Sequence, residues 1–125
     1  MPEYRLRHND MAPGRARVLA HEAVSGVLSR DRADDFVLMV SEVVANAVRH
    51  APPERDGNVV LRLEVGEAAV RAIVMDGGQE FEFDRATFDP RTNHYGLEIV
   101  DHASSRWGLS LDGEKAVWFE VDLEK

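Results

Sequence analysis

Cysteine is absent from all 125 residues of the chain. This absence excludes a disulfide framework, a thiolate zinc site and a thiol nucleophile. Long apolar runs are also missing, because none approaches the roughly 20 residues that span a bilayer. The first ten residues, MPEYRLRHND, lack the apolar segment of a signal peptide. We therefore expect a cytoplasmic protein with no membrane segment.

Concentrated positive charge is scarce as well. Residues 56–125 hold fifteen Asp or Glu against seven Arg or Lys, while residues 1–55 are balanced, and the formal net charge is -8. Nucleic-acid binding needs a basic surface that neutralises phosphates, so the sequence argues against DNA or RNA as a partner. A phosphorylated small molecule would need a divalent cation between it and the acidic second half.

The remaining composition is that of one folded domain, residues 1–125, with 44% hydrophobic and 30% charged residues. Apolar spacings of three and four predict a helix over residues 13–28 and a second over residues 32–51, which Pro52 and Pro53 end. The apolar stripe of the first helix consists of Val18, Leu19, Ala23, Val27 and Leu28.

Strand patterns dominate the rest of the chain. Residues 3–10 alternate like an edge strand, and two β-branched runs on either side of Gly66 and Glu67 predict an antiparallel hairpin. Residues 79–95 are predicted as a long loop, Gly96 opens a short helix, and a hairpin around Asp112 and Gly113 ends the chain. The predicted fold is an α+β, two-layer sandwich whose antiparallel or mixed sheet is covered by helices on one face.

The stretch SEVVANAVRH in the second helix carries unexpected polar groups. Glu42, Asn46 and His50 are four residues apart and therefore share one face, with a drift of about 40° per step. A carboxylate can accept a proton, an amide oxygen is a hard ligand for a divalent cation, and Arg49 could face phosphate oxygens. The alternative is the solvated face of an ordinary amphipathic helix, with His50 favoured by the helix dipole.

Two glycine clusters have a similar double meaning. In VMDGG, residues 74–78, the glycines form a tight turn or allow a ligand to approach the backbone while Asp76 accepts a hydrogen bond from it. Gly96 is a helix cap or offers a backbone amide to phosphate.

Order and spacing together carry a family resemblance. SEVVANAVRHA resembles the N box of the GHKL (Bergerat-fold) ATPases, in particular small actinobacterial ATP-binding proteins related to anti-sigma-factor serine kinases and histidine-kinase catalytic domains. VMDGG resembles their first glycine box, and YGLEIVDHASSRWG, residues 95–108, resembles the second.

The resemblance implies ATP and magnesium as cofactors and a histidine-kinase-like ATPase fold. It also implies a role for each matching position. Glu42 would be the general base, Asn46 the magnesium ligand, Arg49 a phosphate contact, His50 a packing or nucleotide contact, Asp76 the acceptor for the adenine amino group, Gly78 the glycine beside adenine, and Gly96 and Leu97 the helix start near the phosphates.

The implied function is that of an ATP-binding regulator that phosphorylates a serine on a small antagonist (anti-anti-sigma) protein, sequesters a sigma factor, or does both; related kinases suggest a homodimer. Departures from the family pattern keep an alternative open. His94 replaces the first glycine of the second box, and residues 79–95 contain acids and aromatics but no glycine. A catalytically degenerate protein-interaction module with weak or no nucleotide binding therefore remains the second interpretation.

Overall fold

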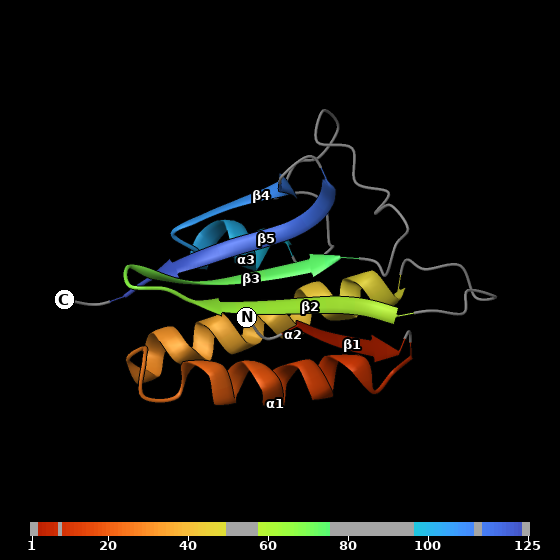
Figure 1. Ribbon diagram of the computed structural model, residues 1–125, viewed down its shortest axis with the longest axis horizontal. Coiled ribbons are helices and arrows are strands. Elements are labelled where there is room, and N and C mark those ends of the chain that lie inside the picture. Colours follow the sequence, from red (N-terminus) through yellow and green to blue (C-terminus); the bar gives the residue numbers. More distant parts are fainter. Residues whose placement is uncertain (1–2, 8, 50–57, 76–96, 112–113, 124–125) are drawn as a thin grey trace.

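The computed structural model describes residues 3–7, 9–49, 58–75, 97–111 and 114–123. Its elements are β1 (Glu3–Arg7), α1 (Ala12–Val24), α2 (Arg30–Arg49), β2 (Asn58–Val65), β3 (Ala69–Met75), α3 (Leu97–Ala103), β4 (Arg106–Leu111) and β5 (Glu114–Asp122). Helices and sheet form two layers (Figure 1), which confirms the predicted α+β sandwich. No helix within these ranges is both long and apolar enough to cross a bilayer.

The five strands form one sheet in the order β1-β2-β3-β5-β4, and each neighbouring pair is antiparallel. Both predicted hairpins are present, with Val60 opposite Met75 in the first and Trp107 opposite Phe119 in the second. After β3 the chain reaches edge strand β4 through α3, and β5 then returns between β4 and β3. The residues predicted to end β3, Asp76 to Gly78, lie outside the described ranges.

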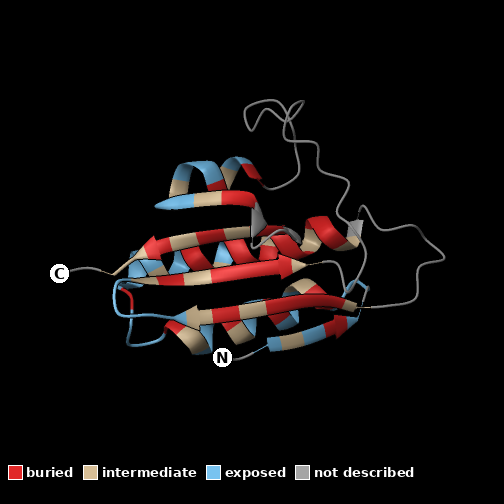
Figure 2. Ribbon diagram, turned by 45° about the horizontal axis from the view of Figure 1, so that its top comes forward, coloured by how far each residue is buried: buried red, intermediate tan, exposed pale blue. Residues whose placement is uncertain are grey.

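The core lies between the sheet and α1 and α2. Val59, Leu61 and Leu63 of β2 are buried on the helix side, while the intervening Arg62 and Glu64 are only half-buried, as the two-residue period of a strand requires. Figure 2 shows buried residues concentrated on the central strands and on the helix surfaces behind them. Phe36 of α2 meets Phe119 of β5 edge to face, with ring centroids 5.4 Å apart.

Helix α1 buries a different stripe from the predicted one. Its buried side chains are Ala12, Ala16, Ala20 and Val24. Val18 and Val27 are 58% and 37% exposed, so their predicted burial was wrong. Small alanines at a spacing of four let α1 pack closely against α2, which larger side chains on that face would prevent. The helix also ends at Val24, earlier than predicted, and the turn after it uses Gly26 at a φ of 79°.

Ion pairs cross the sheet face that points away from α1 and α2. Arg71 of β3 lies 3.4 Å from Glu64 of β2 and 2.6 Å from Glu120 of β5, and Arg106 of β4 lies 2.6 Å from the other oxygen of Glu120. These contacts link four neighbouring strands. On the same face the Trp118 indole lies over Gly108, where a Cβ atom would be only 2.6 Å from Nε1.

Candidate functional site

Helix α2 positions the candidate site, and its first turn is well secured. The backbone N–H of Arg32 donates to Ser29 Oγ at 3.4 Å, and Asp31 places a negative charge in the first turn. The Arg32 guanidinium also donates to the carbonyl of Asp122 at 2.7 Å, which ties the start of the helix to the end of β5. The N-terminal end of the twenty-residue helix is thus fixed against the sheet, and the polar residues Glu42 and Asn46 lie in its second half.

Asn46 is the unusual residue of α2. Its side chain is 1% exposed, and neither Oδ1 nor Nδ2 has a hydrogen-bond partner among the described residues. Nearly all buried polar side chains in folded proteins are hydrogen-bonded, because desolvating an amide without compensation is costly. A solvated polar face, the bland interpretation of the sequence, is therefore wrong for Asn46. A ligand can supply the interaction that this buried carboxamide lacks among the described residues.

Glu42 lies one turn before Asn46 on α2 but nearer to solvent. It is half-buried, whereas the neighbouring Val43 is 1% exposed and belongs to the core. Four residues of α-helix rise about 6 Å, so the carboxylate and the amide are adjacent positions along one side of the helix. The pair therefore offers a proton acceptor that solvent can reach and, beside it, a neutral hard oxygen in a dry environment.

Helix α3 packs against α2. Leu97 is its first residue and is completely buried, so its side chain anchors the helix start in the core. At the other end, Trp107 Nε1 donates to Asp101 Oδ1 at 3.0 Å, and this bond holds α3 against β4. Sequence reasoning missed this contact, although a tryptophan at the start of the strand after the helix was the available signal.

The other predicted site residues fall at or beyond the limits of the description. Arg49 is the last residue of α2, and its side chain is not described; His50, Asp76, Gly78 and Gly96 lie outside the described ranges. The structure thus brings Glu42 and Asn46 together on α2 and places Leu97 on the adjoining helix. The roles of the remaining residues stay predictions.

The donor set at Asn46 fits magnesium. Within the described ranges no three His, Cys, Asp or Glu side chains gather in one place. Magnesium commonly takes only one or two protein oxygens and completes its octahedron with substrate phosphates and water. Oδ1 of Asn46 matches that mode of binding, because it is a neutral oxygen with no hydrogen-bond partner among the described residues.

Comparison with known proteins identifies the family of the chain. Residues 6–113 match the family model described as "Histidine kinase-like ATPase domain". The serine-protein kinase RsbW of Bacillus subtilis is 40% identical over 109 residues, which cover 81% of this chain and 66% of the relative. The RsbW of Staphylococcus aureus MSSA476 is 27% identical over 111 residues, covering 82% and 67%.

A sensor histidine kinase, PdtaS of Mycobacterium tuberculosis H37Rv, is 32% identical over 81 residues, which cover 60% of this chain and 15% of the relative. The chain thus spans slightly less than two thirds of the Bacillus kinase and a small part of the sensor kinase. The family model covers most of the chain, and the α+β sandwich is consistent with it. The chain therefore belongs to the histidine kinase-like ATPases.

Proposed function

We propose that this protein is an ATP-binding regulator of the anti-sigma-factor type that transfers a phosphoryl group to a serine of a small antagonist protein. The observation that carries the proposal is the buried amide of Asn46, which has no hydrogen-bond partner among the described residues and lies one helical turn from the half-buried carboxylate of Glu42. Similarity to relatives described as serine-protein kinases supports serine as the acceptor.

The chain's residues divide the work of binding. Asn46 Oδ1 would hold magnesium, which would neutralise charge on the phosphates. The other nucleotide contacts are proposed for Arg49, His50, Asp76, Gly78, Gly96 and Leu97. Buried Leu97 serves this purpose by fixing the start of α3 against the core, so that the helix beside α2 keeps a constant position.

Glu42 acts on the acceptor. Its carboxylate accepts the proton of the serine hydroxyl while the serine oxygen bonds to the γ-phosphorus and the bond from that phosphorus to the ADP oxygen breaks. Partial exposure suits this role, because the carboxylate must reach a group on another protein and afterwards release the proton to water. Asn46, which has no acidic proton, serves only to bind.

The proposed partners are the antagonist protein that carries the serine and a sigma factor that the regulator sequesters. We also propose that the protein forms a homodimer. The acidic second half, with fifteen Asp or Glu against seven Arg or Lys, suits protein partners and magnesium-bound nucleotide better than nucleic acid.

Calorimetric titration with ADP and ATP, each with and without magnesium, tests the binding step. We expect binding that magnesium strengthens, and loss of that dependence in Asn46→Ala. Asn58→Ala, at the start of β2, is the matched control and should behave like the wild type. Unchanged magnesium dependence in Asn46→Ala would refute the assigned ligand.

Transfer of radiolabelled phosphate from ATP to candidate antagonist proteins tests the chemical step. Glu42→Gln should bind nucleotide normally yet lose transfer, while Glu22→Gln, an exposed carboxylate of α1, should retain it. Wild-type protein that binds nucleotide but transfers phosphate to no candidate would favour a binding regulator. Protein that binds no nucleotide at millimolar concentration would favour the degenerate interaction module.

A further inference from the structure

One face of α2 runs from open surface into the candidate site. Its members follow one another at spacings of four, three and four residues, so they share an arc of about 60° of the helix; they are Asp31, Asp35, Leu38 and Glu42. Asp31 and Asp35 are exposed, and Leu38 is 43% exposed. Glu42 is half-buried, and Asn46, one turn later, is 1% exposed. Exposure thus falls steadily toward the proposed site of reaction.

Leu38 is the apolar member of this face. A single exposed leucine is common on protein surfaces and needs no explanation by itself. Leu38, however, lies one helical turn, about 6 Å along the axis, before Glu42, the carboxylate proposed to accept the serine proton. An acceptor serine that reaches Glu42 therefore brings its neighbouring side chains to Leu38, where an apolar side chain is removed from water.

The two aspartates give the face a negative charge. No cation within the described ranges forms an ion pair with either of them. The neighbouring Arg32 donates to the carbonyl of Asp122 of β5, and Arg30 lies about 100° around the helix from Asp31. Asp31 also suits the positive end of the helix dipole, but Asp35 lies beyond the first turn and gains little from it. The charge of Asp35 is therefore available to a partner.

We propose that Asp31, Asp35 and Leu38 form a docking face for the antagonist protein, which selects a serine accompanied by one apolar and one basic side chain. The inference rests on the proposed transfer of phosphate to serine and names the kind of segment that receives it. Along the helix axis Leu38, Asp35 and Asp31 lie about 6, 10 and 16 Å before Glu42. In an extended segment, which rises about 3.3 Å per residue, the apolar residue is then two positions from the serine and the basic residue four, on the same side of the strand.

Synthetic peptides test this selection by fluorescence polarisation without nucleotide. The basic peptide carries one serine, a leucine two positions away and an arginine four positions away, and the acidic peptide has glutamate in place of the arginine. Each peptide is made with the serine first and with the serine last. The wild type should bind the basic peptide at least about fivefold more tightly than the acidic peptide in one of these orders. No binding at millimolar peptide, or equal binding of both peptides, would overturn the proposal.

Charge reversal on the protein shows which residue selects the basic side chain. Asp35→Lys should exchange the preference, so that the acidic peptide binds more tightly than the basic one. Glu22→Lys, an equal change of charge on the exposed side of α1, should keep the preference of the wild type. Loss of folding would weaken the binding of both peptides, so it cannot produce an exchange. An unchanged preference in Asp35→Lys would refute the assigned charge contact.

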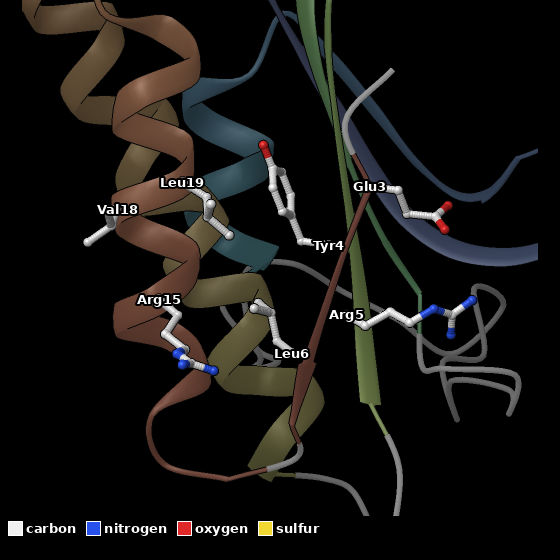
Figure 3. A pocket seen from close by; sticks show the side chains of 7 residues that line it. All are labelled: Glu3, Tyr4, Arg5, Leu6, Arg15, Val18 and Leu19. Atoms are coloured by element: carbon white, nitrogen blue, oxygen red, sulfur yellow. The ribbon is translucent and has the colours of Figure 1, made fainter.

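A separate substitution tests the apolar contact. Leu38→Ser should lower the affinity for the basic peptide about tenfold and reduce its dependence on the leucine of the peptide. Val18→Ser is the matched control and should bind like the wild type. Val18 is 58% exposed, but it borders a groove of about 530 Å³ between β1 and α1 and points away from β1 (Figure 3). Equal affinities of Leu38→Ser and the wild type would overturn the contact.

Phosphate transfer to the same peptides separates this inference from the proposed function. Transfer to the basic and acidic peptides with equal kcat/KM would support the proposed kinase and overturn the docking face. Selective binding of the basic peptide without any transfer would support the docking face and count against the proposed chemistry of Glu42. Selective binding together with selective transfer is the result that we expect.

Discussion

Replacing Asn46 by leucine should stabilise the protein and at the same time abolish its magnesium-dependent nucleotide binding. The two side chains have the same branched shape and the same number of heavy atoms, so leucine adds no cavity. The asparagine buries two polar atoms with no partner among the described residues, and such a group costs about 1–3 kcal/mol. Leucine removes that cost and adds apolar burial at a position only 1% exposed.

The free energy of unfolding of Asn46→Leu should therefore rise by about 1–3 kcal/mol. Urea titration at equilibrium measures the change, and a Tm higher by roughly 3–6 °C per kcal/mol should accompany it. Asn46→Ala removes the same polar atoms but leaves a cavity, so it should be less stable than Asn46→Leu. The comparison of the two variants separates the effect of removing the polar atoms on the free energy of unfolding from the effect of the lost side-chain volume.

Ligand-dependent melting supplies the second half of the test. Nucleotide with magnesium at a hundred times its Kd should stabilise the wild type by about 2.7 kcal/mol and leave the Tm of Asn46→Leu unchanged. A leucine variant that is less stable than the wild type by 1 kcal/mol or more would refute the reasoning, because the amide would then have to be satisfied in the free protein.

Three further predictions concern the scaffold. Gly108→Ala should lower the free energy of unfolding by about 1–3 kcal/mol in urea titration, because its Cβ would lie 2.6 Å from Trp118 Nε1. Gly14→Ala in α1 is the control and should be neutral or stabilising, because no atom lies within 4 Å of its added Cβ. Equal effects of the two substitutions would contradict the packing argument. Trp107→Phe should lose the 3.0 Å bond to Asp101 and about 0.5–1.5 kcal/mol, with faster amide hydrogen exchange confined to α3, whereas unchanged exchange there would show that the bond does not hold the helix.

The third scaffold prediction follows from Glu120. Burial raises the pKa of this carboxyl, but hydrogen bonds from Arg106 and Arg71 outweigh burial and leave the pKa below its usual 4.5. A lowered folded-state pKa contributes stability above about 4.5 and loses it as pH falls through the folded value. Urea titrations from neutral to acid pH should thus show a smaller acid loss for Glu120→Gln than for the wild type, and equal losses would remove the ion-pair network as a source of acid sensitivity.

Much of the fold was predictable because its signals are local and strong. The α2 stripe from Phe36 to Ala47 repeats over about three turns, and the alternation in β2 and β3 fixes which side chains face the helices. A one-residue shift in the register of either pattern would bury charged side chains, so few alternative arrangements of the chain are compatible with the sequence. The position of β5 between β3 and β4 was harder to predict, because strand order depends on contacts between residues far apart in the sequence.

The buried face of α1 could not be predicted from hydrophobicity. A ranking by residue type favours burial of Val18 and Val27, yet the helix buries Ala16 and Ala20 instead. The close approach of α1 to α2 selects small side chains, and that distance is a property of the packed pair rather than of either sequence segment.

The residues of the candidate site on α2 could be predicted from the sequence, but the burial of each side chain could not. Spacing placed Glu42 and Asn46 on one side of a helix, yet it could not separate a solvated face from a binding site, because both have polar residues four positions apart. The folded structure shows what spacing could not, that Asn46 is buried while Glu42 is half-buried.

The polar groups of this protein fall into two physical classes. On the outer sheet face, ion pairs join Glu64, Arg71, Glu120 and Arg106 into a linked, partly exposed network in which each charged group has a partner of opposite charge. Asn46 lies on the helix side of the sheet and has no such partner among the described residues, although its burial makes a partner far more valuable there. A buried amide with no partner among the described residues lowers the free energy of unfolding of the free protein. Binding of a ligand that supplies the missing bond recovers that free energy. For this reason the free energy of unfolding and the affinity for nucleotide should change in opposite directions at residue 46.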